Sequence, residues 1–183
     1  RNGIFCGVIL LILSFLISST INHTFSIFLL IYLVTSFLYS IYLKKLKYLD
    51  CLILVGFYVL RIFSGGIIIN IIPSLWLVIF SFFIFLSLAF IKRYIELNLH
   101  YDTAEAGIIP GRKYSFKDKK KIYLLGIISG LVSTLTLAIY LGSDTVVQLY
   151  KSPIFIWIAI PILFFWIILF WKKAKNKQIY DDP

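Results

Sequence analysis

The chain has 183 residues, of which 61% are hydrophobic, 18% are aromatic and only 14% are charged, and its mean hydropathy is +0.96. These values exclude an ordinary soluble domain, and several apolar runs are each long enough to cross a hydrocarbon core of about 30 Å, so we predict an integral membrane protein. The net charge of +10 would favour nucleic-acid binding in a soluble protein, but here the basic residues lie between the apolar runs and indicate membrane topology instead.

Six apolar runs follow one another along the chain, and short polar segments separate the first four. The runs are expected at about residues 4–21, 24–43, 49–72, 74–91, 122–141 and 154–171. Short alternating barrel strands are absent from the pattern, and helices satisfy every backbone group inside a bilayer. We therefore predict an all-α fold, a polytopic bundle of six transmembrane helices that forms one transmembrane domain over residues 1–183.

The basic residues are distributed unevenly around these runs. All of the 18 Lys and Arg residues except Arg61 and Lys151 lie before the first run or after the second, fourth and sixth. Because basic loops remain in the cytoplasm, both ends of the chain and the polar segment 92–121 are assigned to the cytoplasmic side of the cell membrane. We expect segment 92–121 to be a loop outside the hydrocarbon, between the fourth and fifth helices.

Two ionisable residues interrupt the third run, and they share one helical face. Asp50 and Arg61 are eleven positions apart, which corresponds to about 20° in azimuth and about 16 Å in height. Ionisable groups at membrane depth often mark a substrate or ion pathway, although Arg61 could also snorkel or pair with a carbonyl. Asp50 could instead cap its helix, and Lys44, Lys45 and Lys47 could serve topology alone.

A second polar cluster lies at the end of the fourth run, where Lys92 and Glu96 have the spacing of a helical ion pair and Arg93 lies between them. The turn before this run, at Pro73 and Ser74, is short, so the third and fourth helices should be antiparallel neighbours. We therefore expect both clusters to face one cytoplasmic pocket, lined by cations and suited to a molecule with an anionic head and a hydrocarbon tail. The glycines at 65 and 66 would allow a close helix approach or a bend around a cavity.

Five sequence motifs, in order, resemble those of the UbiA superfamily of intramembrane prenyltransferases. They are YSIYLKKLKYLD, VLRIFSGG, IKRYIEL, GRKYSF and YDDP. Within this superfamily, the motifs are most similar to those of the decaprenyl-phosphate phosphoribosyltransferase-like branch. The resemblance implies nine transmembrane helices, of which this piece would supply the third to the eighth. The Mg²⁺-binding NDxxDxxxD motif and the last helix would then lie outside it, and the piece alone is expected to be inactive.

The resemblance also assigns roles to residues. Asp50, Lys44 and Arg61 are the catalytic candidates, and the substrate-binding candidates are Tyr39, Lys92, Arg93 and Glu96. In such enzymes cations and Mg²⁺ stabilise a departing diphosphate while an acceptor attacks the electron-poor carbon. Many relatives carry a second DxxxD motif after the matching fourth run. The stretch IKRYIELNLHYDTAEAG lacks that motif, which favours phosphoribosyl transfer from phosphoribosyl diphosphate to a polyprenyl phosphate over aromatic prenylation.

Three other functions fit parts of the sequence. They are prenyl transfer to another acceptor, transport or flipping of an anionic lipid, and a membrane scaffold without chemistry. A transporter should have polar residues leading to the outer side, whereas the first, second, fifth and sixth runs contain only scattered Ser and Thr. The expected partners of a transferase are a polyprenyl lipid, a diphosphate substrate and the bilayer itself.

Overall fold

In the computed structural model, the described residues are 2–99, 112–144, 146, 150 and 153–178, and all regular structure among them is helical. The main helices are α1 (Asn2–Ile21), α2 (His23–Ile41), α3 (Leu49–Ile68), α4 (Leu75–Leu99), α5 (Lys119–Leu141) and α7 (Ala159–Lys175). Three short 3₁₀ helices accompany them, namely η1 (Leu43–Lys45), η2 (Phe116–Asp118) and η3 (Pro153–Ile158). The prediction of an all-α fold is confirmed for this part of the chain.

Five helical segments are long and apolar enough to cross a membrane. They are His23–Ile41, Leu49–Ile68, Leu75–Leu99, Phe116–Leu141 and Ile154–Lys175, and a shorter apolar stretch, Phe5–Ile21, lies in α1. Each of the six expected runs therefore corresponds to a helix. The apolar side chains on their outer faces are widely exposed, as a bilayer-spanning bundle requires.

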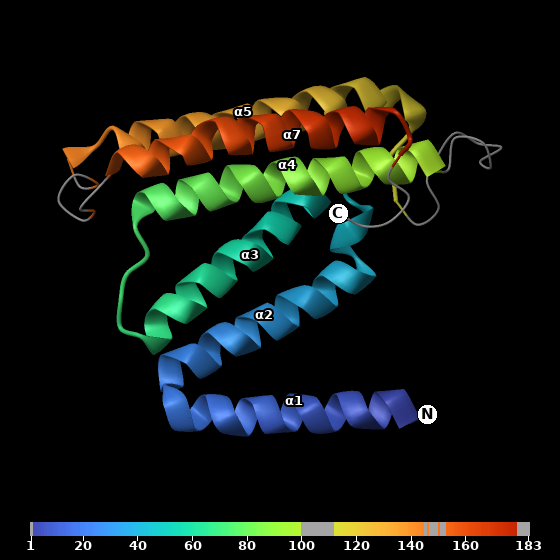
Figure 1. Cartoon of the computed structure of the whole chain (residues 1–183). Coiled ribbons are helices and arrows are strands. Elements are labelled where there is room, and N and C mark those ends of the chain that lie inside the picture. The colour runs from blue at the N-terminus through green and yellow to red at the C-terminus, as the bar shows by residue number, and fades with distance from the viewer. Residues whose placement is uncertain (1, 100–111, 145, 147–149, 151–152, 179–183) are drawn as a thin grey trace.

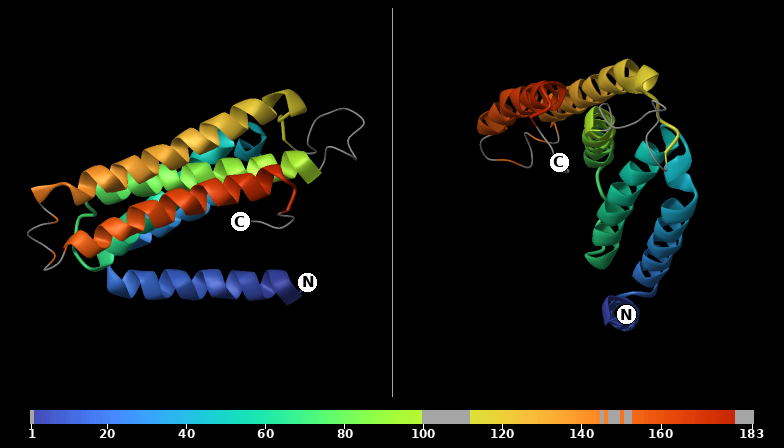
Figure 2. Two further views of the ribbon diagram at one scale, coloured as in Figure 1. Left: turned by 45° about the horizontal axis from the view of Figure 1, so that its top comes forward. Right: turned by 90° about the vertical axis from the view of Figure 1, so that its right-hand side faces the viewer.

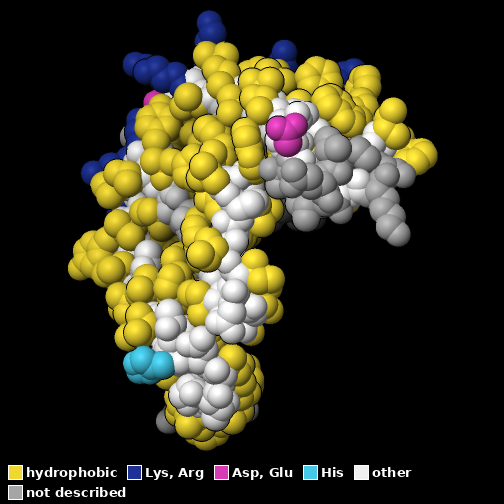
Figure 3. Space-filling model, turned by 90° about the vertical axis from the view of Figure 1, so that its left-hand side faces the viewer, with side chains coloured by type: hydrophobic (Ala, Val, Ile, Leu, Met, Phe, Trp, Pro, Cys, Tyr) yellow, Lys and Arg dark blue, Asp and Glu magenta, His cyan; other side chains and the backbone are white. Residues whose placement is uncertain are grey.

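Successive helices lie side by side in an arc, from α1 at one extreme to α5 and α7 at the other (Figures 1 and 2). One end of the bundle, at the right of Figure 1, contains the C-terminal ends of α4 and α7, the N-terminal end of α5 and the connection through η1. We call this the basic end, because Lys44, Arg93, Lys119 and Lys175 lie in these segments. The opposite end, seen in Figure 3, is mostly hydrophobic, and the visible Lys and Arg side chains lie along its top and upper left edges.

Local sequence explains the sharp connections between helices. Asn22 caps α2 by accepting a hydrogen bond from the Thr24 backbone N–H at 2.8 Å. Between α3 and α4 the chain turns tightly, and the Ile71 N–H donates to the Gly66 carbonyl at 2.9 Å. A Cβ on Gly66 would lie 2.5 Å from the Ile71 carbonyl oxygen, whereas a Cβ on Gly65 would meet nothing. Gly66 therefore serves this turn, and Gly65 makes no close helix contact among the described residues.

The helical boundaries differ from the expected loop 92–121. Helix α4 continues to Leu99, and the described chain resumes at Arg112 before η2 and α5. Lys92, Arg93 and Glu96 are thus helical residues, and the expected loop is wrong both for its first eight positions and for residues 116–121, which lie in η2 and α5. The polar side chains misled the prediction because they are bound inside the protein, so they do not require water. Residues 100–111 lie outside the described part of the chain.

The tightest packing joins α4, α5 and α7. Trp171 of α7 is 1% exposed, and its indole N–H donates to the Ser87 hydroxyl of α4 at 3.1 Å. Ser87 in turn donates to the Gly126 carbonyl of α5 at 2.7 Å. A Cβ on Gly126 would collide with the Trp171 ring, and one on Gly130 would lie 2.7 Å from Ile167. These glycines let three backbones approach closely, as small residues do between membrane helices.

We predict that Gly126→Ala destabilises the bundle by about 1–3 kcal/mol, because the added methyl group must displace the Trp171 ring. Unfolding in mixed detergent micelles, followed by tryptophan fluorescence, measures the change. Gly56→Ala is the matched control, since a Cβ there meets nothing within 4 Å and alanine favours a helix by up to about 1 kcal/mol. Equal stability of the two variants would contradict the proposed packing role.

Candidate functional site

Asp50 forms the centre of a buried polar cluster at the basic end. It lies in the first turn of α3, and its side chain is fully buried. Its Oδ2 accepts hydrogen bonds from Arg93 Nε at 2.6 Å and Arg112 Nη1 at 3.2 Å, and its Oδ1 accepts one from the Tyr114 hydroxyl at 2.5 Å. The carboxylate is therefore held from α4 and from the segment that precedes α5.

Arg93 is the second buried centre, and its side chain is also fully buried. Besides Asp50, its guanidinium binds Glu96 Oε1 through Nη1 at 2.6 Å and the Tyr39 hydroxyl through Nη2 at 3.3 Å. One planar side chain thus connects α2, α3 and α4. This use of several fixed donors in different directions is characteristic of arginine and is not available to lysine.

Arg112 closes the arrangement, because its Nε lies 3.4 Å from Glu96 Oε2 while its Nη1 binds Asp50. We call the set Tyr39, Asp50, Arg93, Glu96, Arg112 and Tyr114 the Asp50–Arg93 cluster. It contains two arginines and two carboxylates, so its formal charges balance. Burying a charge is costly unless it is paired and hydrogen-bonded, and here each buried charge has an opposite partner.

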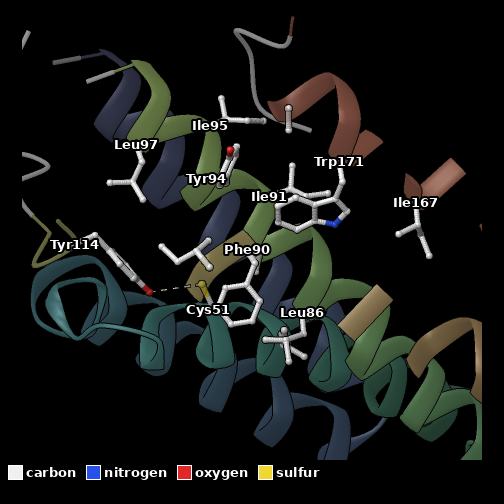
Figure 4. Packing of buried hydrophobic residues seen from close by; sticks show 14 residues of the cluster. Cys51, Leu86, Phe90, Ile91, Tyr94, Ile95, Leu97, Tyr114, Ile167 and Trp171 are labelled. Atoms are coloured by element: carbon white, nitrogen blue, oxygen red, sulfur yellow. Dashed lines mark hydrogen bonds between the residues drawn. The ribbon is translucent and has the colours of Figure 1, made fainter. Parts of the chain in front are cut away.

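The Tyr114 hydroxyl links the cluster to the chain segment that precedes α3. It is fully buried, donates to Asp50, and accepts a hydrogen bond from the Tyr48 backbone N–H at 2.6 Å. Its oxygen also lies 3.8 Å from Cys51 Sγ, the contact drawn as a dashed line in Figure 4. Burial, the nearby Cys51 and the hydrogen bond to Asp50 raise the pKa of Tyr114 above its ordinary value. Tyr114 therefore remains a neutral donor at physiological pH.

The local backbone explains how Asp50 reaches this position. After η1, Tyr48 adopts a positive φ of 63°, an uncommon conformation for a tyrosine, and α3 begins at the next residue. Tyr48 is the N-cap residue, so the predicted alternative of Asp50 as the cap is wrong. Asp50 lies in the first helical turn, where the helix dipole favours a negative charge. Burial, and then the nearby Asp118, raise the pKa of Tyr48.

A second ion pair stabilises the same end of the bundle. Lys47 Nζ lies 2.6 Å from Asp118 Oδ2. Asp118 also accepts hydrogen bonds from the backbone N–H of Ser115 at 2.9 Å and from its hydroxyl at 3.2 Å. The pair is partly exposed, so it contributes little free energy, but it holds the start of α5 beside the connection before α3.

The predicted site residues fall into two groups. The structure joins Tyr39, Asp50, Arg93 and Glu96 by direct contacts, whereas the two clusters were expected to face a common open pocket. The carboxylate of Glu96 contacts Arg93 and Arg112, and its expected pairing with Lys92 stays a prediction. Lys92 lies on α4 with a partly exposed side chain, and Lys44 lies half-buried in η1. The cations nearest Asp50 are therefore bound to carboxylates and do not line an open surface.

Arg61 is separate from the cluster. Its exposed guanidinium donates to the Tyr32 hydroxyl at 2.6 Å and lies 5.6 Å from the centroid of the Tyr58 ring. Asp50 is buried against α4, whereas Arg61 faces α2, because α3 inclines away from α4 toward its C-terminal end (Figures 1 and 2). Asp50 and Arg61 were predicted to share one face of the helix, but they contact different neighbouring helices.

The residues at the cluster do not fit a magnesium site. Within the described part of the chain no group of three or more His, Cys, Asp and Glu side chains could hold a metal ion. Asp50 and Glu96 are both bound to arginines, and Mg²⁺ prefers several free oxygen ligands in an octahedral arrangement.

The sequence interpretation missed Arg112 and Tyr114 as parts of this site. Arg112 and Tyr114 lie in the motif GRKYSF, which was noted without assigning a role to its members. Their basic and aromatic side chains had been attributed to a polar loop. The signal in the sequence was an arginine and a tyrosine just before the fifth apolar run, together with an aspartate at the start of the third run.

Comparison with known proteins finds similarity to a protein described as uncharacterized. The chain is 26% identical over all 183 residues to the uncharacterized protein y4nM of Sinorhizobium fredii (strain NBRC 101917 / NGR234). The chain spans 35% of the length of that relative. No family model and no solved structure matches the chain.

We predict that Arg93→Gln destabilises the protein by about 3–5 kcal/mol, because it leaves Asp50 buried without its main counter-charge. Unfolding in mixed micelles measures the loss. The double variant Asp50→Asn with Arg93→Gln should recover part of it, since no uncompensated carboxylate remains at position 50. Lys47→Gln is the control, and breaking this partly exposed pair should cost no more than about 1 kcal/mol.

Strictly additive effects of Asp50→Asn and Arg93→Gln would contradict the assigned ion pair, since residues in contact are expected to couple by about 0.5–3 kcal/mol.

Proposed function

We propose that the chain is part of an integral membrane transferase of the UbiA type. In this proposal it moves a phosphoribosyl group from phosphoribosyl diphosphate to a polyprenyl phosphate, at the cytoplasmic side of the cell membrane. The whole protein would have nine transmembrane helices. The observation that supports the proposal is the Asp50–Arg93 cluster, where three of the motifs that carry the resemblance meet in direct contact.

Each of these motifs contributes side chains to the cluster. YSIYLKKLKYLD provides Tyr39 and Asp50, IKRYIEL provides Arg93 and Glu96, and GRKYSF provides Arg112 and Tyr114. Segments more than 40 residues apart in the chain are joined by these contacts, such as the one between Arg93 and Asp50. A merely topological role for the polar residues would not require specific pairs between them.

In the proposed reaction the bond between the ribosyl C1 and the diphosphate oxygen breaks, and a phosphate oxygen of the lipid forms the new bond at C1. The cluster positions the helix ends around the substrates, while Lys44 and Lys92 attract the diphosphate from the basic end. Tyr39 accepts a hydrogen bond from Arg93, so its own hydroxyl proton is free to donate to a substrate oxygen. Arg61 acts at a separate point along α3, where it can contact an anionic group at greater depth.

Mg²⁺ would supply charge stabilisation for the departing diphosphate. Because the described carboxylates do not fit a magnesium site, we assign its ligands to the NDxxDxxxD motif expected elsewhere in the whole protein. Prenyl transfer to another acceptor would use the same motifs and remains the alternative within the transferase class.

One observation favours a second candidate, the transport or flipping of an anionic lipid. Arg61 lies within the apolar segment Leu49–Ile68, and its exposed guanidinium is supported by Tyr32 and Tyr58. A cation at this depth could bind a lipid phosphate during its passage.

The test uses the whole parent protein in liposomes that contain polyprenyl phosphate. Labelled phosphoribosyl diphosphate is added with Mg²⁺ or with EDTA, and lipid-linked phosphoribose is extracted and measured. We expect Mg²⁺-dependent product, whereas lipid flipping without product would favour the transport candidate. Absence of transfer from either phosphoribosyl diphosphate or a polyprenyl diphosphate would refute the transferase proposal.

We predict that Tyr39→Phe lowers kcat/KM of this reaction by roughly tenfold, since one hydrogen bond to the substrate is lost. The variant should remain folded, because Arg93 keeps its two carboxylate partners. Lys45→Gln is the control, as this lysine is exposed in η1 and has no proposed contact with substrate. Unchanged kcat/KM in Tyr39→Phe would contradict the assigned contact.

A further inference from the structure

A pocket distinct from the Asp50–Arg93 cluster opens where the basic ends of α4, α5 and α7 meet. Its volume is about 370 Å³. Four of its lining residues are lysines and three are aromatic, namely Lys117, Lys119, Lys120, Lys175, Tyr94, Phe116 and Tyr123. Among the described residues that line it, none is acidic. The pocket therefore combines concentrated positive charge with an aromatic wall.

The aromatic side chains fix the position of two of these lysines. Lys119 Nζ lies 5.3 Å from the centroid of the Tyr94 ring, and Lys175 Nζ lies 5.9 Å from that of Tyr123. The two tyrosine rings are 5.6 Å apart, and Tyr123 packs edge-on against Trp171 at 5.4 Å. Figure 4 shows Tyr94 on the same side of α4 as the core around Trp171. The ammonium groups thus project from a packed aromatic base.

The electrostatics of the pocket favour an anion. The nearest described carboxylate in sequence, Asp118, is bound to Lys47 at 2.6 Å and to Ser115. The pocket also lies at the start of α5, where the backbone N–H groups and the helix dipole attract negative charge. Like charges gathered in one pocket repel one another, and a bound anion relieves that repulsion.

The position of the pocket relative to the spanning segments indicates the kind of anion. Lys117 lies at the beginning of the apolar segment Phe116–Leu141, and Lys175 lies at the end of Ile154–Lys175. This is the level of lipid headgroups, where tyrosines are also enriched. One turn below, the outer face of α5 exposes Leu124 by 57% and Leu125 by 40%, which provides an apolar surface for an acyl chain.

We propose that this pocket binds the phosphate headgroup of an anionic phospholipid of the bilayer. Lys117, Lys120 and Lys175 contact the phosphate, and the lipid chain lies along the exposed face of α5. Basic pockets between membrane helices are suited to such headgroups. Tyr94 follows Arg93 by one residue and so points about 100° away from it around α4. The lipid site is therefore independent of the Asp50–Arg93 cluster and of the proposed transfer reaction.

The experiment measures the binding of short-chain phosphatidylglycerol to the purified protein in neutral detergent, by the shift in thermal unfolding and by native mass spectrometry. The pocket variant is K117Q/K120Q/K175Q. The matched control is K113Q/K121Q/K173Q, which removes the same charge from exposed lysines at the same end, outside the pocket lining. Phosphatidylcholine and inorganic phosphate serve as the neutral lipid and the free anion.

We expect phosphatidylglycerol to stabilise the unmodified protein and the control, and phosphatidylcholine to have little effect. Each lysine near a membrane surface contributes about fivefold to the binding of an anionic lipid, so the pocket variant should bind roughly 100-fold more weakly. Equal weakening in the control would overturn the proposal, because it would show attraction by overall charge. Equal stabilisation by inorganic phosphate would overturn the assignment to a lipid. If the triple variant does not fold, Lys120→Gln alone should still weaken binding by about fivefold, and unchanged binding would overturn the proposal.

Discussion

The buried pair between Asp50 and Arg93 is the interaction on which the arrangement of the basic end depends. Neither side chain could be buried alone, because each would carry an uncompensated charge. Their contact fixes α3 against α4, and the further bonds to Tyr39 and Tyr114 bring in α2 and the segment before α5. A single ionic contact thus determines how four parts of the chain meet.

The cluster and the lysine pocket have different electrostatic roles at the basic end. The cluster is balanced in charge and buried, so it specifies geometry and contributes little long-range attraction. The lysines of the pocket and of η1 lie nearer the surface, and they create the positive potential that an anionic substrate or lipid would meet first. The attraction of an anion to these lysines should therefore weaken with added salt, while the buried ion pairs of the cluster are affected much less.

The sequence predicted the helical fold well, because length and hydropathy determine which segments can span a bilayer. It also predicted that the polar clusters around Asp50 and Arg93 would lie on neighbouring antiparallel helices, since a short turn joins α3 and α4, but it did not predict their direct pairing. It could not give the inclination of α3, which depends on packing and separates Arg61 from Asp50. Nor could composition distinguish Arg93, fully buried in a helix, from a loop residue in water. That distinction depends on partners more than 40 positions away.

The tight turn between α3 and α4 has a consequence for the assembly of the protein in the membrane. Gly66 and the Ile71 N–H join these helices closely, so they can enter the bilayer together as a hairpin. In an antiparallel hairpin the first turn of α3 and the last turns of α4 arrive on the same side. The opposite charges of Asp50 and Arg93 can then neutralise each other during insertion, before either must be desolvated alone. The turn thus places the two partners of the ion pair at the same end of the bundle.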